Sequence, residues 1–338
     1  MIDLLVVGGG PTGLATAILA TRAGFSTTVV EAREGPIDKA CGEGLMPSAV
    51  AALQEMGVCP TGRSFHGIRY VDGTACAEGR FSAGPGLGIR RTQLHQALSA
   101  RADALGVTRV QARAGVPTQG PGWVEAAGVR ASWLVAADGL HSPVRRALGV
   151  ALPPRSPARY GLRRHFHVRP WSDLVEVHWA ADAEAYVTPV ADDLVGVAVL
   201  FGGRGDYDDW LCRFPALRER LAGAPVASSI RGAGPFEQRV ERRRVGRILL
   251  AGDAAGYVDP LTGEGVNLGI AAGAALVRLL RDSRPEAYDA TWRRLTVRHR
   301  ALTHALLWAA RRPALRRRIV PAAGRLPVVF CAALDQLS

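Results

Sequence analysis

The sequence lacks long hydrophobic runs and paired cysteines, and it has almost no lysine. No stretch of about 18 uninterrupted apolar residues occurs, which excludes a membrane-spanning helix. The five cysteines are scattered without a Cys-x-x-Cys spacing, so neither a dithiol redox pair nor a disulfide framework is expected. The first expected strand begins almost at Met1 and leaves no room for a signal peptide. These absences predict a cytoplasmic protein with free thiols.

Positive charge comes almost entirely from arginine, since Lys39 is the single lysine among 42 basic residues. The net charge of +12 suits an acidic partner such as nucleic acid or an anionic membrane. The arginines are spread along the chain, however, without the interleaved aromatic residues on which bases stack. We therefore expect no nucleic-acid binding.

What the sequence does contain is a glycine-rich turn near its N-terminus. The apolar run Leu4–Val7 predicts a buried strand, and residues 14–23 predict an alanine-rich helix directly after the glycines. In this Gly-x-Gly-x-x-Gly pattern, Gly8 permits the tight turn and Gly10 lets the backbone approach a pyrophosphate. Gly13 lets the helix pack on the strand. The helix N-terminus then offers unpaired N–H groups to the phosphates of a dinucleotide.

An acidic residue completes the dinucleotide pattern. A second apolar strand, 27–30, ends at Glu31, which stands about 20 residues beyond the glycine turn. A carboxylate there accepts hydrogen bonds from ribose hydroxyls and repels a 2′-phosphate. We therefore expect FAD or NAD at this site rather than NADP.

Further candidate ligand-facing residues lie in the loops that follow. The loop 38–44 holds Cys41 and Glu43, each followed by a glycine, which favours close approach to a ligand; the alternative for Cys41 is a small buried thiol. Arg91 lies at the head of an expected helix, where it points a planar cation at a phosphate or is simply solvated. Asp138 follows a core strand and so lies at the sheet edge where ligands bind in open α/β folds.

From about residue 151 to 245 the hydrophobic pattern changes from continuous runs to alternation. The alternation predicts a mostly antiparallel second sheet of the kind that walls a substrate pocket. Its expected strands are 163–168, 174–179, 185–190 and 194–201. His165 and His167 share one face of the first strand, but no third ligand lies at a metal-binding spacing. We expect no metal site and a structural or merely polar role for the pair.

The last part of the chain returns to the first pattern and then becomes helical. Residues 247–251 predict a buried strand that leads into Asp253, and Gly263 and Gly265 precede an apolar helix. The N-terminus of that helix is a second place for an anion or a flavin oxygen. Beyond residue 285 we expect helices with clustered arginines, and the final apolar run is too short to span a bilayer. This tail is either an amphipathic helix packed on its own protein or a site of peripheral membrane contact.

Three motifs, in this order, resemble those of the FAD-dependent aromatic hydroxylases and the related geranylgeranyl-reductase-like flavoproteins. They are Gly8-x-Gly10-x-x-Gly13 with Glu31, then Ala137-Asp138-Gly139-x-x-Ser142-x-x-Arg145, then Gly252-Asp253-Ala254-Ala255 with Pro260, Gly263, Gly265 and Asn267. The resemblance implies non-covalent FAD, with its ADP half on the first motif, its ribityl chain at Asp253 and its isoalloxazine along residues 263–267. It also implies that Asp138 serves both FAD and NAD(P)H and that Arg91 touches the FAD phosphates. The expected cofactor contacts are Gly8, Gly10, Pro11, Thr12, Gly13, Glu31, Ala32, Arg33, Cys41, Arg91, Asp138, Asp253, Pro260, Gly263, Gly265, Val266 and Asn267.

The sequence departs from the common phenol hydroxylases in two loops. Residues 41–44 and 260–265 are more similar to the reductase and halogenase branches. The halogenase motif Trp-x-Trp-x-Ile-Pro is absent, and a strand that contains Tyr186 and Pro189 lies in the comparable place, which argues against halogenation. No second Gly-x-Gly-x-x-Gly occurs, so NAD(P)H must dock transiently on the FAD domain.

We therefore predict an α/β flavoprotein with a Rossmann-like FAD-binding domain, a mostly antiparallel β-sheet substrate domain and a helical C-terminal tail. The expected boundaries are 1–64, 90–150 and 246–284 for the discontinuous FAD-binding domain, 65–89 for a hairpin insertion, 151–245 for the substrate domain and 285–338 for the tail. The expected activity is NAD(P)H-dependent monooxygenation of a small hydrophobic or aromatic, natural-product-like substrate. The alternatives are reduction of an alkene in a lipid or polyketide, and a flavin-binding protein without turnover. Cys41, Glu43 and Tyr186 are the candidate catalytic residues.

Overall fold

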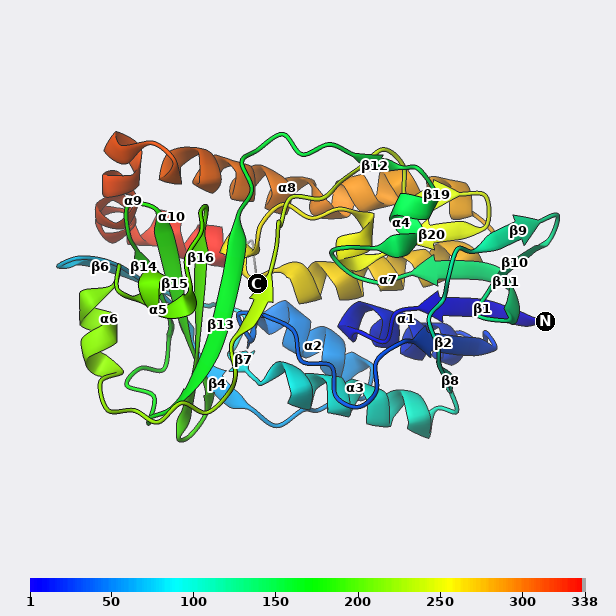
Figure 1. Ribbon diagram of the computed structural model, residues 1–338, viewed down its shortest axis with the longest axis horizontal. Helices are drawn as coiled ribbons and strands as arrows, with labels where there is room; N and C mark the ends of the chain where they lie inside the picture. The colour runs from blue at the N-terminus through cyan, green and yellow to red at the C-terminus, as the bar shows by residue number, and fades with distance from the viewer. Residues whose placement is uncertain (336–338) are drawn as a thin grey trace.

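Two β-sheets lie side by side in the computed structural model, which describes residues 1–335 (Figure 1). The sheet that contains the N-terminal strand occupies the right of Figure 1, and the second sheet stands at the left. Helices of the C-terminal region run along the top of the view and cross from one sheet to the other. This mixed α/β architecture, with its antiparallel second sheet and helical tail, confirms the predicted fold class.

The first sheet has the strand order β19-β20-β11-β1-β2-β8, extended at β11 by β10 and β9. Its strands are β1 (Ile2–Val7), β2 (Thr27–Glu31), β8 (Thr108–Gln111), β9 (Thr118–Gly120), β10 (Trp123–Ala126), β11 (Val129–Ala136), β19 (Arg244–Val245) and β20 (Ile248–Leu250). The pairs β1–β2, β1–β11, β2–β8 and β11–β20 are all parallel. Leu5, Val135 and Leu249 are fully buried between the helices on its two faces, and each such side chain contributes about 1.5–3 kcal/mol on burial.

Three helices pack in the same core as this sheet, and the first residue of each lines the candidate site. They are α1 (Pro11–Arg22), α3 (Arg91–Ala104) and α7 (Gly265–Arg281), and α1 packs against both of the others. Helix α1 begins with Pro11, a residue whose fixed φ and missing N–H suit the first helical position. The predicted strands 4–7 and 27–30 and the three predicted helices are confirmed, although each of these helices begins one to three residues earlier than expected.

The second sheet has the order β17-β13-β16-β15-β14-β5-β6. Its strands are β17 (Arg231–Ala233), β13 (Tyr160–His167), β16 (Leu194–Phe201), β15 (Ala183–Ala191), β14 (Val175–Trp179), β5 (Gly67–Asp72) and β6 (Ala75–Arg80). All neighbours are antiparallel except β14 and β5, so the predicted mostly antiparallel sheet is confirmed. One face of this sheet is covered by α5 (Tyr207–Leu211) and α6 (Pro215–Arg220), whose apolar side chains share a core with it.

The segment 65–89 joins the second sheet instead of standing apart from it. Its hairpin, β5–β6, lengthens that sheet because β5 pairs in parallel with β14. The ends of the segment form a small three-stranded sheet of β3 (Gly44–Leu45), β7 (Gly86–Gly88) and β4 (Arg63–Phe65). Pairing of β3 with β7 ties the loop that contains Cys41 and Glu43 to the start of α3. Two parts of the chain that are distant in sequence therefore meet at one place.

The C-terminal helices close the far end of the second sheet. They are α8 (Tyr288–Ala310), α9 (Pro313–Arg325) and α10 (Pro327–Asp335), and both α9 and α10 contact β6. A separate core that includes Trp179, Val320 and Phe330 forms beneath them. The shorter elements are α2 (Pro47–Glu55), α4 (Pro143–Ala147), β12 (Ala151–Leu152), β18 (Arg239–Val240), η1 (Gly252–Ala255), η2 (Pro260–Thr262) and η3 (Pro285–Ala287). None of the helices in residues 1–335 has the length and apolar character needed to cross a bilayer.

Candidate functional site

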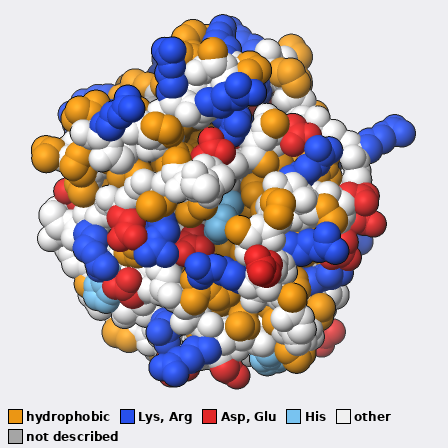
Figure 2. Space-filling model, turned by 90° about the vertical axis from the view of Figure 1, so that its left-hand side faces the viewer, with side chains coloured by type: hydrophobic (Ala, Val, Ile, Leu, Met, Phe, Trp, Pro, Cys, Tyr) orange, Lys and Arg blue, Asp and Glu red, His pale blue; other side chains and the backbone are white. Residues whose placement is uncertain are grey.

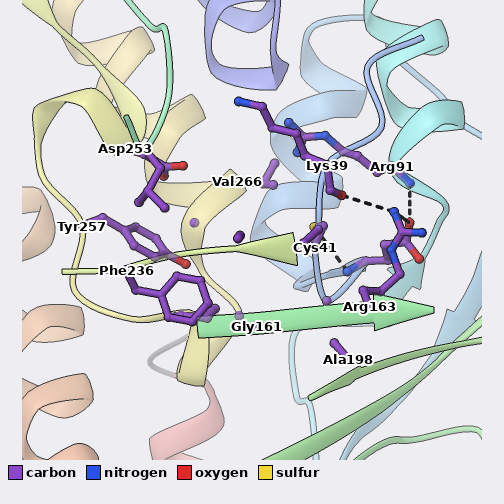
Figure 3. Close-up of a pocket in the computed structure, with 18 of the residues that line it drawn as sticks. Lys39, Cys41, Arg91, Gly161, Arg163, Ala198, Phe236, Asp253, Tyr257 and Val266 are labelled. Carbon is purple, nitrogen blue, oxygen red and sulfur yellow. Dashed lines mark hydrogen bonds and ion pairs between the residues drawn. The ribbon is translucent and has the colours of Figure 1, made fainter. Parts of the chain in front are cut away.

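A cavity of about 640 Å³ lies between the two sheets. The glycine turn after β1 and the loop after β20 line one side, and the inner face of the second sheet lines the other. Figure 3 shows Asp253 and Tyr257 on one side of this space, with Lys39 and Arg91 opposite. Strands β13 and β16 supply Gly161 and Ala198 to its floor. The cavity therefore joins the predicted nucleotide site to the predicted substrate wall.

The glycine turn has the geometry that its sequence predicts. Gly8 has φ +106, a conformation that side chains disfavour, and a Cβ on it would overlap the carbonyl of Ala137. A Cβ on Gly13 would overlap the carbonyl oxygen of Gly8, so only glycine allows α1 to approach β1 this closely. The N-cap of α1, Gly10, has no side-chain cap, which leaves the first N–H groups of the helix free for an anion.

Glu31 lies at the end of β2, where the ribose is expected. Its carboxylate accepts hydrogen bonds from the Gly9 N–H at 2.8 Å and from the Arg33 Nε–H at 2.9 Å. Burial alone raises the pKa of Glu31, but these hydrogen bonds and the charge of Arg33 outweigh it and lower the pKa. An ionised carboxylate at this place is suited to accept ribose hydroxyls, as the sequence predicted. Ala32 and Arg33 are exposed beside it, and Arg33 borders the cavity.

Positive charge gathers on the opposite side of the cavity. Lys39 and Arg91 line this side, and neither has an ion-pair partner within residues 1–335. The Nε atom of Arg91 is buried without a hydrogen-bond partner in the described chain, and its Nη2 lies 3.7 Å from where a Cβ of Gly10 would stand. A cluster of unpaired cations next to a helix N-terminus fits a pyrophosphate. Binding of a phosphate by Arg91 stays a prediction.

Two aspartates line the cavity, one in the loop that follows β11 and one in the loop that follows β20. Asp138 accepts a hydrogen bond from the Val144 N–H at 3.1 Å, while its other carboxylate oxygen is buried without a partner in residues 1–335. Asp253 points into the cavity (Figure 3), and burial raises its pKa although Lys39 and Arg91 act to lower it. The buried Arg145 donates to the carbonyl oxygens of Asp253 and Ala254 and so holds the two loops together. Arg145, the last residue of the second predicted motif, is therefore a structural clamp.

The segment before α7 forms one wall of the cavity. Pro260, Gly263, Gly265 and Val266 line it, whereas Asn267 donates from Nδ2 to the Glu264 carboxylate at 3.2 Å. The second oxygen of Glu264 is buried without a partner in the described residues. Burial raises the pKa of Glu264 to about 7. Sequence reading passed over Glu264, because nothing in its spacing shows that α7 buries it.

Protonation of Glu264 gives a prediction for stability. An unfolded glutamate ionises near pH 4.5, whereas the folded one stays protonated up to about pH 7, so wild-type stability falls as the pH rises between these values. Glutamine does not ionise. The free energy of unfolding of Glu264→Gln, relative to that of the wild type, is therefore expected to be about 3 kcal/mol higher at pH 8.5 than at pH 4.5. Urea unfolding of the apoprotein at both pH values measures this. The exposed Glu286→Gln serves as control, and parallel pH profiles for wild type and Glu264→Gln would contradict the assignment.

The three candidate catalytic residues are placed differently. Cys41 lines the cavity, and burial raises the pKa of its thiol, so the thiol is neutral. Tyr186 also lines it, but its hydroxyl donates to the Leu261 carbonyl oxygen at 2.8 Å. The Glu43 carboxylate is 1% exposed and is held by protein groups alone. It accepts from the Arg91 N–H at 2.8 Å and contacts His165 Nε2 at 2.5 Å.

His165 and His167 share a strand, as predicted, but their surroundings differ. His165 is fully buried between Glu43 and the Ser228 hydroxyl, while His167 is exposed at the strand end. The Arg163 guanidinium also approaches His165 Nδ1 at 3.1 Å. Because a guanidinium only donates, it favours the tautomer in which Nε2 carries the proton and donates to Glu43. No group of metal-ligating side chains occurs within residues 1–335.

Arg163 is the site residue that sequence reading missed most clearly. It is buried, borders the cavity and forms an ion pair with Asp38 in the loop that leads to Cys41. The available signal was its position at an inward-facing place of an alternating strand, two residues from His165. A charged residue at such a position needs a buried partner, and that partner lies 125 residues away in sequence.

The single lysine permits a direct test of the phosphate site. Lys39 faces the cavity, and its pKa is lowered by burial and by the charges of Arg33 and Arg91, which makes its amine more reactive. We expect an amine-acylating reagent to modify Lys39, and FAD at about 100 times its Kd to slow this roughly hundredfold by occupying the cavity. Peptide mass spectrometry measures both rates. The N-terminal amine of Met1, whose residue is 78% exposed, is the internal control; equal rates with and without FAD would place the cofactor elsewhere.

Comparison with known proteins agrees with this geometry. The family described as FAD binding domain matches residues 1–192 and 216–290. A menaquinone reductase of Mycolicibacterium smegmatis is 28% identical over 88% of this chain and 81% of its own length. A rifampicin monooxygenase of Streptomyces venezuelae is 26% identical over 80% of this chain, which spans 62% of that enzyme. In structure, a flavoprotein/dehydrogenase of Cytophaga hutchinsonii superposes with a TM-score of 0.85 at 17% identity, over 98% of this chain and 92% of its own, and so shares the fold.

Proposed function

This chain belongs to the FAD-binding-domain family of flavin-dependent oxidoreductases, and from that premise we propose that it is an NAD(P)H-dependent monooxygenase of a hydrophobic aromatic substrate. The observation that carries the proposal is the apolar lining of the part of the cavity that lies against the second sheet. Apolar side chains dominate this part, and it opens directly onto the nucleotide cradle. They include Phe65, Ile68, Tyr70, Val175, Val177, Leu200 and Phe236. Such a chamber suits a ring-containing substrate and excludes water from the place of reaction.

Within this proposal the chain's own residues bind and orient FAD. The free N–H groups at the start of α1, with Lys39 and Arg91, would hold the pyrophosphate, and Glu31 would accept the ribose hydroxyls. Asp253 would hold the ribityl chain, and the segment that contains Gly263, Gly265 and Val266 would hold the ring system. Bound FAD supplies the electron transfer and the reaction with dioxygen, which no side chain provides. The unpartnered buried atoms of Arg91 and Asp138 and the glycine cradle fit such a group.

NAD(P)H is proposed as a transient reductant. Within residues 1–335, the second sheet has no strand that is followed by a glycine-rich turn and a helix, as β1 is followed by α1. It therefore offers no second nucleotide-binding unit of this kind in the described chain. Asp138, which lines the cavity and has one buried oxygen without a partner in the described chain, is the expected point of contact for both nucleotides.

Reduction of an alkene is the second candidate function, and the Cys41 thiol favours it. A neutral thiol that lines the cavity is a proton donor, and alkene reduction needs a hydride and a proton. The chain also spans 81% of the menaquinone reductase but only 62% of the rifampicin monooxygenase. The third possibility, a protein without turnover, is set aside because these relatives are named enzymes.

A panel assay tests the proposal. Purified protein with FAD is expected to oxidise NADPH or NADH faster when a hydrophobic phenol or a fused aromatic polyketide is added, and to consume dioxygen in proportion to product. Mass spectrometry should then show products heavier by one oxygen atom. Stimulation only by isoprenoid alkenes or quinones, with saturated products and no stoichiometric use of dioxygen, would replace the proposal by the reductase. Arg204→Gln, at an exposed position that does not belong to the cavity lining, is the matched control.

A further inference from the structure

An exposed apolar turn joins α9 to α10. Leu326, Val328 and Val329 are 56%, 80% and 61% exposed, and Pro327 between them is exposed as well. Large apolar side chains that project singly from a surface are common, but a run of neighbours that are all exposed needs an explanation. Figure 2, which faces the left-hand end of Figure 1, has hydrophobic and basic side chains next to one another in its upper part. The turn is thus an apolar tip without a cover in the described chain.

The exposed side of α9 leads into this tip and is basic. Arg318 and Arg325 are seven residues apart, which places them on one side of the helix, and Arg317 is exposed next to them. None of these three has an ion-pair partner within residues 1–335, whereas Arg316 on the inner side pairs with Asp72 at 3.3 Å. The helix is therefore anchored by one arginine and presents three others to solvent.

The inner side of α10 belongs to the wall of the cavity. Phe330 is buried against Tyr70, with ring centroids 4.9 Å apart, and both Tyr70 and Leu334 line the cavity. The same nine-residue helix therefore carries exposed valines on its outer side, and on its inner side it carries the buried Phe330 and the cavity-lining Leu334. Helix α10 alone therefore links the exposed tip to the apolar part of the cavity.

We propose that the basic side of α9 and the apolar tip 326–329 form a docking surface for an anionic lipid bilayer. A bilayer surface has an outer layer of anionic headgroups and an apolar layer of acyl chains beneath it. The headgroup phosphates attract the arginines, while the valines of the protruding tip enter the boundary of the acyl chains. A second copy of this chain is a poorer occupant. Self-association through this tip would bring unpaired arginines of two chains, each of net charge +12, close together.

Vesicle sedimentation tests this proposal without using activity. Full-length protein with FAD is expected to bind vesicles of phosphatidylcholine with phosphatidylglycerol, to bind pure phosphatidylcholine much less, and to dissociate at high salt. Arg318→Gln with Arg325→Gln should weaken binding on the order of fivefold for each arginine. Val328→Ser with Val329→Ser should weaken it about tenfold, because less apolar area is buried.

Matched variants and a second measurement keep the outcome clear. Val116→Ser with Arg204→Gln changes a 72% exposed valine and an exposed arginine elsewhere, and it is expected to bind as the wild type does. All variants should keep FAD content and melting temperature. Absence of binding to anionic vesicles, or equal loss in the control, would overturn the proposal. So would light scattering that shows a dimer in the wild type and a monomer in Val328→Ser with Val329→Ser. None of these results depends on whether the enzyme is a hydroxylase or a reductase.

Discussion

A Gly13→Val variant is expected to bind FAD more weakly than the wild type by about a hundredfold or more. A Cβ at this position overlaps the Gly8 carbonyl oxygen, and the overlapped atom is backbone that belongs to the pyrophosphate turn itself. Overpacking of a well-packed core typically costs about 1–3 kcal/mol, and here the only relief is to move α1 away from β1. Both the turn and the helix N-terminus would then leave the phosphate position. We expect FAD affinity to fall by about a hundredfold or more, since 2.7 kcal/mol corresponds to that factor.

Flavin fluorescence titration of the apoprotein measures this loss. Gly202→Ala is the control, because the added methyl group there meets only ordinary contacts, the nearest at 3.7 Å from the Ala158 carbonyl oxygen. Circular dichroism should show that Gly13→Val keeps its secondary structure, since the second sheet has a core of its own. Wild-type FAD affinity in Gly13→Val would mean that the cofactor does not use the α1 turn.

The second large effect separates the two candidate reactions, and it concerns Cys41 and Glu43. With isotopically labelled dioxygen, the wild-type product is expected to carry the label, and Cys41→Ala is expected to retain most turnover. The structure gives a reason to expect the same of Glu43→Gln. Its carboxylate is 1% exposed and engaged by the Arg91 N–H and His165, so it does not reach a substrate.

The reductase alternative gives the opposite result in the same assay. There Cys41 donates the proton, a role typically worth about 10²–10⁴-fold in rate, and the Cys41→Ala product would be formed that much more slowly and without label. Glu43→Gln separates indirect effects from chemistry. Because Glu43 receives the first N–H of α3, its loss is expected to weaken FAD binding without changing the fraction of labelled product. Thr188, which donates to the Gly42 carbonyl oxygen, offers Thr188→Val as a control for simple loosening of the loop.

Much of the nucleotide half of the molecule was predictable from sequence because its signals are local. A buried parallel strand is a continuous apolar run, and the glycines of the turn lie within six residues of its end. Glu31 follows the next strand, and parallel strands bring their carboxyl ends to one edge of the sheet. Most of the residues that the family resemblance assigned to FAD, including Arg91, Asp138 and Asp253, also line one cavity. The remaining ones, which do not belong to its lining, are Gly8, Gly13, Glu31, Ala32 and Asn267. Their contacts with FAD remain a prediction.

The second sheet was predictable as strands but not as a wall with a particular chemistry. Alternation in 160–201 indicates which residues share a face, but it does not say what opposes that face. Arg163 and His165 acquire their meaning from the loop 38–43, which packs against them from the other domain. In the same way, β5 joins β14 across about 100 residues, a pairing that no local pattern specifies.

The sequence by itself determined the cofactor class, the two kinds of sheet and the absence of a spanning helix, because each depends on periodicity or on spacing within one segment. The tertiary structure alone decided which charged groups are buried and what they face. It engaged the Glu43 carboxylate with the Arg91 N–H and His165, left Glu264 with an unpartnered oxygen and placed the single lysine among the phosphate-side cations. These outcomes depend on desolvation and on partners more than 100 residues away, as with Glu43 and His165. A buried charge is defined by its neighbours in space, and only the fold supplies them.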